Sequence, residues 1–192
     1  MKKAELRFCA AMLALLILMS GCGGPKTLTQ TSVGKIPEWY TDIKSDDTIL
    51  RSPNTQASQD MQLAVDKAKN GCRDDLASQL ETRVQNLQKR FSEEVGVGAE
   101  SQLLQQFTAA SKQVISTVLN GARTEKQEIV QDGKTFRAYV LMTLPIGEAN
   151  TRILQQIKTR NEMYTRFRST EAFKELEADA QKYEDWKKAQ GN

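Results

Sequence analysis

Apolar side chains recur every three or four residues along two long stretches of the chain. The first stretch runs from about residue 55 to 92 and the second from about 99 to 119, with glycines between them. This spacing is that of amphipathic helices that bury one face. The predicted buried positions are Met61, Val65, Ala68, Cys72, Leu76, Leu80, Val84, Leu87 and Phe91 in the first helix, and Leu103, Phe107, Ala110, Val114 and Val118 in the second.

After these helices the apolar positions fall on every second residue. Residues 123–131 and 134–144 alternate in this way around Asp132-Gly133, a dipeptide preferred in type I′ hairpin turns. Such a turn places Ile129 opposite Phe136 and Glu128 opposite Arg137. One hairpin face is then largely apolar and is expected to cover the helices; it carries Ile129, Phe136, Ala138, Val140, Met142 and Leu144.

The opposite hairpin face carries Val130, Tyr139 and Leu141 beside the expected Glu128–Arg137 pair. It is more apolar than ordinary surface and more polar than a core. We therefore expect it to be partly covered, either by the C-terminal helix of the same chain or by a neighbouring copy. Val130, Tyr139 and Leu141 are the candidate interaction face.

The remaining elements complete an α+β fold. Residues 48–51 form a short strand candidate that Pro53 is expected to end. Residues 148–167 and 170–189 have helical spacing. The pattern predicts a small antiparallel sheet, made of the hairpin and one short strand, packed on two long helices, with an additional long C-terminal helix.

The N-terminal residues have the pattern of a secretory signal. Lys2, Lys3 and Arg7 precede twelve residues without a polar side chain, 8–19. Twelve residues are too few for a membrane-spanning helix, which needs about 20. The sequence Leu-Met-Ser-Gly-Cys at residues 18–22 then indicates a lipoprotein processing site with Cys22 acylated. The alternative is an ordinary signal peptide cut nearby, which leaves Cys22 as a free thiol.

These patterns divide the chain into four parts. Residues 1–21 are the predicted lipoprotein signal peptide, and 22–36 are the lipidated cysteine and a polar tether. Fully extended, that tether reaches at most about 50 Å. Residues 37–157 are the predicted α+β domain, and 158–192 a C-terminal helical extension. Gly23, rather than an aspartate, follows Cys22, which favours the outer membrane over the inner one.

Composition argues against an enzyme. The chain has no histidine, which removes the usual acid–base group near neutral pH and the Ser-His and Cys-His nucleophile pairs. We therefore expect no catalytic residues, no cofactor and no metal site. Cleavage of the predicted signal peptide, residues 1–21, takes away three basic residues and one acid from a chain of net charge +3. The remaining chain is nearly neutral, so its charge gives no reason to expect a nucleic-acid partner.

Three smaller features have two interpretations each. Trp39 either anchors the chain to the core or stacks on a ligand. Cys72 lies on the buried helix stripe, so an inert thiol is favoured over a reactive one. Four basic side chains near Tyr164 form either a solvated helix face or a phosphate contact; they are Lys158, Arg160, Arg166 and Arg168.

Three stretches together resemble the LPP-twenty family of small outer-membrane lipoproteins, related to the flagellar accessory lipoprotein FlgP. They are Ile-Pro-Glu-Trp at 36–39, the alanine-containing helix 64–80, and Asn-Gly-Ala-Arg at 120–123 leading into Phe-Arg-Ala-Tyr-Val-Leu at 136–141. The resemblance covers about residues 36–157. It implies an α+β domain, no enzymatic activity and a surface or flagellum-associated structural role, and it assigns no site residues.

We therefore expect a non-enzymatic outer-membrane lipoprotein with a structural or assembly role in the bacterial envelope. Its expected partners are the membrane, through N-terminal acyl chains, and a second copy or another envelope protein. The alternative is a periplasmic ligand-binding or envelope-sensing module that uses Trp39 and a cleft beside the hairpin. A pocket with converging polar groups favours the alternative.

Overall fold

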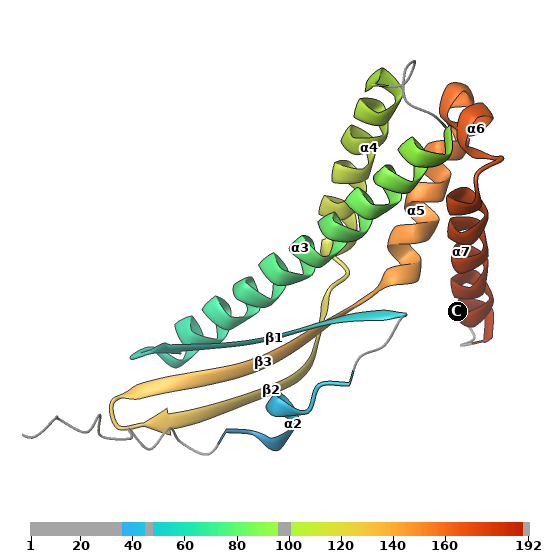
Figure 1. Ribbon diagram of the computed structural model, residues 1–192. Helices are drawn as coiled ribbons and strands as arrows, with labels where there is room; N and C mark the ends of the chain where they lie inside the picture. Colours follow the sequence, from blue (N-terminus) through green and yellow to red (C-terminus); the bar gives the residue numbers. More distant parts are fainter. Residues whose placement is uncertain (1–35, 45–47, 96–100, 190–192) are drawn as a thin grey trace, which may run out of the picture. The chain divides into compact units, whose positions relative to one another are not determined.

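A three-stranded antiparallel sheet packs on the longer of two long helices, residues 61–95, and the second long helix, residues 101–119, packs on the first (Figure 1). This computed structural model describes residues 36–44, 48–95 and 101–189, which belong to the unit Gly34–Asn192. The predicted signal peptide, Cys22 and the tether lie outside the described residues. The strands are β1 (Ile49–Ser58), β2 (Arg123–Asp132) and β3 (Thr135–Pro145), and the helices are α2 (Glu38–Thr41), α3 (Met61–Val95), α4 (Ser101–Leu119), α5 (Ile146–Lys158), α6 (Asn161–Phe167) and α7 (Glu171–Ala189).

The helical stripes form the core that their spacing predicts. In α3 and α4 every predicted position is buried except Met61, which is 48% exposed, and Leu87, which is partly buried. The helix α3 begins at Met61 and not near residue 55, because the preceding residues belong to β1. The Asp60 carboxylate accepts a hydrogen bond from the Leu63 backbone N–H (2.7 Å), which caps the start of the helix.

Strand β1 is longer than the sequence pattern predicts. It continues through Pro53 to Ser58 and pairs antiparallel with β3 along its whole length. The strand order is β1-β3-β2, so β1 is an edge strand with β3 on one side only. An edge position tolerates a proline because one of the two sets of backbone N–H groups needs no partner strand. The prediction that Pro53 ends the strand is wrong for this reason.

The hairpin turn is displaced from its predicted position. Ile129 pairs with Ala138 and Glu128 with Tyr139, so the predicted Ile129–Phe136 and Glu128–Arg137 pairings are wrong. Gly133 has φ +60°, and no other described residue has a positive φ. One positive φ at the first central residue is the pattern of a type II′ turn over Gly133-Lys134, not of type I′.

The change of register leaves both hairpin faces as predicted. Ile129 moves by two positions relative to β3, and an even shift keeps each side chain on its own face. Ala138, Val140, Met142 and Leu144 are accordingly buried in the core beneath the helices, and Ile129 and Phe136 pack against its margin.

Three phenylalanine rings join helices that are far apart in sequence. The ring of Phe91 in α3 stacks on Phe167 in α6, with centroids 4.2 Å apart, and Phe107 in α4 meets both edge-on at 5.5 and 6.0 Å. All three side chains are buried. The residues after 157, expected as an extension, therefore contribute to the same core as the long helices.

The C-terminal region contains two helices where the sequence predicts one over 148–167. Helix α5 ends at Lys158, Arg160 takes an extended conformation, and α6 begins at Asn161. Helix α7 begins as predicted, with the Thr170 hydroxyl accepting the Phe173 N–H at 3.1 Å. The Glu94 carboxylate at the end of α3 accepts the N–H groups of Glu171 (2.5 Å) and Ala172 (3.2 Å). This second cap joins the start of α7 to α3.

Candidate functional site

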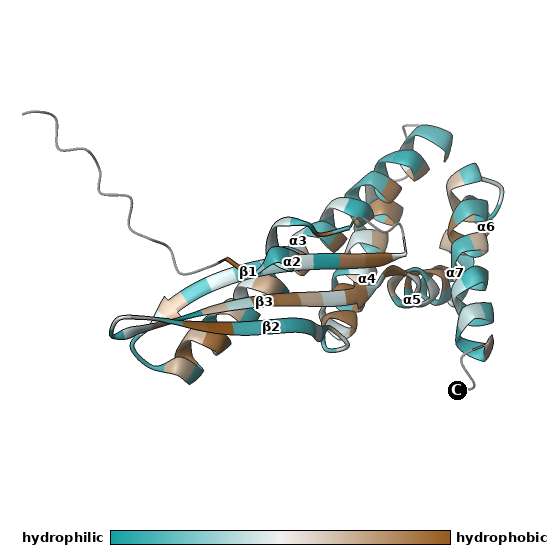
Figure 2. Ribbon diagram, turned by 90° about the horizontal axis from the view of Figure 1, so that it is seen from below, coloured by the Kyte–Doolittle hydropathy of each residue, from teal (hydrophilic) through white to brown (hydrophobic). Residues whose placement is uncertain are grey.

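The candidate interaction face of the hairpin is covered by the chain's own N-terminal segment. Helix α2 lies on the side of the sheet opposite α3 (Figures 1 and 2). The rings of Tyr40 and Tyr139 meet edge-to-face with centroids 5.0 Å apart. Tyr139 and Leu141 are only 2% and 3% exposed, and Val130 is half-buried. The expected cover by α7 is therefore wrong, because α2 lies on this face, and no second copy is needed to bury Tyr139 and Leu141.

Trp39 belongs to this cover. Its ring lies 5.7 Å from that of Tyr40, and the Lys126 ammonium of β2 lies 5.9 Å from the Trp39 ring centroid. Arg51 of β1 forms an ion pair with Glu125 of β2 at 3.4 Å, which spans β3 on the same face. Burial raises the pKa of the Tyr40 hydroxyl above its ordinary value. These contacts support the interpretation that Trp39 anchors the chain.

Cys72 is a buried thiol between α3 and the sheet, as predicted. Its Sγ donates a weak hydrogen bond to the Val140 carbonyl at 3.6 Å, and its side chain is fully buried. Burial raises the pKa of the thiol. Because the thiolate is the reactive form, this position disfavours nucleophilic chemistry.

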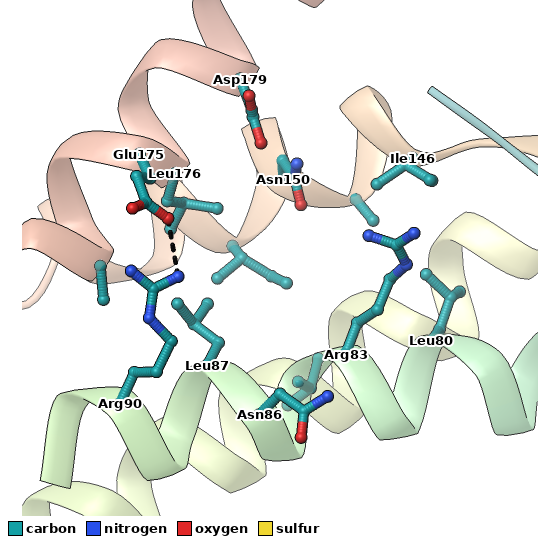
Figure 3. Close-up of a pocket in the computed structure, with 14 residues that line it drawn as sticks. Leu80, Arg83, Asn86, Leu87, Arg90, Ile146, Asn150, Glu175, Leu176 and Asp179 are labelled. Atoms are coloured by element: carbon teal, nitrogen blue, oxygen red, sulfur yellow. Dashed lines mark hydrogen bonds and ion pairs between the residues drawn. The ribbon is translucent and has the colours of Figure 1, made fainter. Parts of the chain in front are cut away.

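A groove of about 230 Å³ lies elsewhere, between α3, α5 and α7 (Figure 3). Its floor is apolar and is formed by one face from each helix, which include Val84, Ile153 and Leu176. Its rim is polar. The full lining is Leu80, Arg83, Val84, Asn86, Leu87, Arg90, Ile146, Ala149, Asn150, Ile153, Ala172, Glu175, Leu176 and Asp179. We call this site the α3–α5–α7 groove.

One end of the α3–α5–α7 groove is closed by an ion pair. The Arg90 guanidinium donates a hydrogen bond to the Glu175 carboxylate at 2.7 Å, joining α3 to α7. This hydrogen bond lowers the pKa of Glu175 and raises that of Arg90. Together with the Glu94 cap, the pair fixes the distance between the end of α3 and the start of α7.

Toward the other end of the groove, a cation is left unpaired. Arg83 extends from α3 toward Asn150 and Ile146 on α5 (Figure 3). It has no hydrogen bond or ion pair within the part of the chain that the structure describes. Asp179 of α7 lies on the opposite rim and forms an ion pair with Lys182 at 3.2 Å. The groove therefore offers an apolar floor and one available guanidinium.

The size of the groove limits what it can bind. Pockets for drug-sized ligands usually measure about 300–1,000 Å³, whereas this groove of about 230 Å³ suits one large side chain or a small molecule. Within residues 36–44, 48–95 and 101–189, no group of three or more cysteine or acidic side chains is placed to hold a metal ion. Among the helices so described, none is long and apolar enough to cross a membrane.

The basic side chains near Tyr164 do not form one phosphate site. Lys158 forms an ion pair with Glu177 at 2.6 Å, and the Arg160 guanidinium donates to the Gln156 carbonyl at 3.0 Å. Lys158 therefore has a partner on α7 and Arg160 has one on α5. Arg166 and Arg168 are exposed, in agreement with a solvated helix face.

No protein-family model matches the chain, and no curated protein is significantly similar to it. The resemblance to the LPP-twenty family therefore stays a prediction. Sequence reasoning missed the α3–α5–α7 groove, because Arg83 and Arg90 look like ordinary polar positions of an amphipathic helix. The helical periodicity locates the apolar face of each helix, but it does not show where three such faces leave a gap.

Proposed function

We propose that the protein is a non-enzymatic lipoprotein of the bacterial outer membrane with a structural or assembly role in the envelope. The observation that carries this proposal is the Leu-Met-Ser-Gly-Cys sequence at residues 18–22, directly after a basic segment and twelve apolar residues. Each buried methylene of an acyl chain contributes about 0.8 kcal/mol of membrane affinity. The two or three chains of a lipidated N-terminal cysteine make a stable anchor.

The described domain supports a structural role more than a ligand-binding one. The half-apolar sheet face is occupied by Trp39 and Tyr40 from the same chain, so Tyr139 and Leu141 are not open to a ligand. The α3–α5–α7 groove is smaller than the usual pocket for a drug-sized ligand. A folded domain carried on a lipid anchor is suited to contacts with other proteins near the membrane.

Flagellum association is the narrower form of the proposal, and it rests on the family resemblance alone. Localisation of a tagged copy in cells with and without flagella tests it. Co-localisation that depends on the flagellum supports it, and an even envelope distribution in both strains contradicts it. The expected partners are a second copy or another envelope protein.

A periplasmic ligand-binding or envelope-sensing module is the second candidate. One observation favours it, namely that Arg83 extends toward Asn150 across the rim of an apolar groove (Figure 3). Trp39, the residue first assigned to such a role, does not line this groove. A saturable rise in melting temperature with a small carboxylic acid, lost in Arg83→Gln, would favour this candidate.

The lipid anchor is tested by changing Cys22→Ser and labelling cells with palmitate. We expect the variant to take up no label and to remain as an uncleaved or wrongly cleaved precursor. Cys9→Ser and Cys72→Ser are matched controls, since the first cysteine lies in the predicted signal and the second is buried in the core. Both should be labelled normally. Normal processing and labelling of Cys22→Ser would refute the proposal.

A further inference from the structure

The largest exposed aromatic side chain of the described residues is near the end of α7. Trp186 is 53% exposed. Its ring stacks on Tyr183 with centroids 5.8 Å apart and an interplanar angle of 17°. Tyr183 is itself packed closely against Gly147 of α5. The indole is therefore an exposed apolar group whose neighbour is fixed to the domain, so little conformational freedom is lost when a partner covers it.

Trp186 and the α3–α5–α7 groove are on the same side of α7. Glu175 and Asp179 line the groove, and Trp186 follows Asp179 by seven residues, close to two helical turns. The indole is thus displaced by about 10 Å along the helix from the rim of the groove. Because the exposed indole of Trp186 and the apolar groove lie on the same side of α7, two copies of the chain can each place the indole in the groove of the other.

The charges along α7 fit an antiparallel pair. Residues 171–180 hold four acids and one base, Lys174, for a net charge of −3, whereas residues 181–189 hold three bases and two acids, for a net charge of +1. The acids of the first part are Glu171, Glu175, Glu177 and Asp179, and the bases of the second are Lys182, Lys187 and Lys188. An antiparallel second copy brings the basic end of each helix beside the acidic half of the other. A parallel copy would instead place like charges together.

We propose that two copies of the chain associate through antiparallel α7 helices, each inserting Trp186 into the α3–α5–α7 groove of the other. The apolar floor then covers the indole, and the unpaired Arg83 guanidinium lies within reach of the ring face as a cation–π partner. Because each copy gives one indole and one groove, the contact is self-complementary and closes at two copies. The inference deepens the assembly role proposed above by naming the partner and the surface.

The expected affinity is modest. One helix and one groove give an interface smaller than the roughly 1,600 Å² of a standard complex, so we expect the dimer to form at about ten to a hundred micromolar. Tryptophan and arginine commonly dominate the binding energy of such contacts. Copies held in one membrane plane have a raised effective concentration, which compensates for a weak contact.

Sedimentation equilibrium on the whole chain in detergent measures this association. We expect Trp186→Ala and Arg83→Glu each to raise the dimer dissociation constant at least tenfold. Leu63→Ala is the matched apolar control, because Leu63 is 47% exposed at the other end of the domain. Arg73→Glu makes the same charge change as Arg83→Glu, also on α3 but outside the groove lining. Both controls should leave the dissociation constant unchanged.

Cysteine cross-linking tests the geometry. In a chain whose Cys9 and Cys22 are serine, Asn86→Cys introduces a thiol at the groove rim and Lys187→Cys introduces one beside Trp186, which is kept. A mixture of the two single variants should give a covalent dimer on oxidation, and the double variant should give dimers without longer species. A ladder of larger species would show a head-to-tail contact and overturn the reciprocal pair.

Two further outcomes would also overturn the proposal. They are a strictly monomeric chain at all accessible concentrations, and self-association that neither Trp186→Ala nor Arg83→Glu weakens. Palmitate labelling at Cys22 is measured separately and does not depend on α7. The dimer can therefore fail while the lipoprotein proposal stands, and the reverse result is equally distinguishable.

Discussion

Replacing Gly147 by alanine tests the contact that holds the end of α7 in place. A methyl group built on Gly147 would lie 2.3 Å from both Cβ and Cγ of Tyr183 and 2.5 Å from its Cδ2. Optimal carbon–carbon contacts are about 3.5–4.0 Å. The Tyr183 Cβ is attached directly to the α7 backbone, so no rotation of the side chain removes the overlap. Helix α7 must move away from α5 by about 1 Å or more.

This displacement has a calculable cost. Overpacking of a well-packed interior usually costs about 1–3 kcal/mol. For a chain of this size, each kcal/mol shifts the melting temperature by about 2–4 °C. We therefore expect Gly147→Ala to melt about 2–12 °C below the unchanged protein and to weaken the α7-mediated dimer.

Thermal unfolding followed by far-ultraviolet circular dichroism measures the effect, with Gly71→Ala as the control. A methyl group at Gly71 would meet the amide of Asn54, with its nearest atom Nδ2 at 2.4 Å, and this amide is the end of a side chain that can rotate. Alanine also gains about 1 kcal/mol over glycine inside a helix. At Gly71 we expect the unfavourable contact with the Asn54 amide and the favourable helix propensity of alanine to offset each other within about 1 kcal/mol.

Equal melting temperatures for Gly147→Ala and the unchanged protein would refute the close packing of α5 on Tyr183. A loss at Gly71→Ala as large as that at Gly147→Ala would refute the distinction between a fixed stem and a rotatable amide. The first result would also remove the reason for regarding the Tyr183–Trp186 stack as preorganised.

Two other predictions concern the turn and the buried thiol. Gly133 has φ +60°, so Gly133→Val should lower the free energy of unfolding by more than about 1 kcal/mol in urea titrations, whereas Gly133→Asn, a residue that tolerates this region, should lose less. Burial raises the pKa of the Cys72 thiol in the folded protein. The stability that comes from keeping this thiol protonated is complete below the pKa of an unfolded cysteine, about 8.5. It is lost as the pH rises through the higher pKa of the folded state. Urea unfolding between neutral and alkaline pH should therefore show a fall in stability that is smaller in Cys72→Ala; equal slopes would contradict the effect of burial.

The long helices were predictable because each turn places an apolar side chain on the same face, so the pattern recurs many times in the sequence. The buried stripe from Val65 to Phe91 follows directly from spacings of three and four residues. The ends of the elements depend instead on tertiary contacts. Helix α3 starts where the Asp60 carboxylate caps it, and β1 extends past Pro53 because β3 is available along its whole length. Neither partner is visible in the local sequence.

The hairpin register shows a different limit. A type I′ turn over Asp132-Gly133 and a type II′ turn over Gly133-Lys134 both require a positive φ at Gly133. They differ by a two-residue shift, which keeps every side chain on the same face. The hydrophobic pattern of β2 and β3 is consequently satisfied by both, and it cannot distinguish them.

The candidate site was less predictable than the fold. The cover of Tyr139 comes from Tyr40 in a four-residue helix, which is too short to give a periodic signal. The α3–α5–α7 groove is lined by residues from Leu80 to Asp179, so it exists only once three separate helices have packed. The unpaired state of Arg83 likewise depends on which acids the fold brings near it.

The stack of Phe91 on Phe167 has a consequence for the order of events during synthesis. The early half of the chain cannot complete its core until the ribosome has made residues beyond Phe167, and the Glu94 cap needs the Glu171 N–H as well. A nascent chain that lacks these residues leaves the Phe91 end of the α3 stripe without its stacking partner. For a polypeptide that we propose is threaded unfolded through a translocation channel, late closure keeps it from folding prematurely in the cytoplasm.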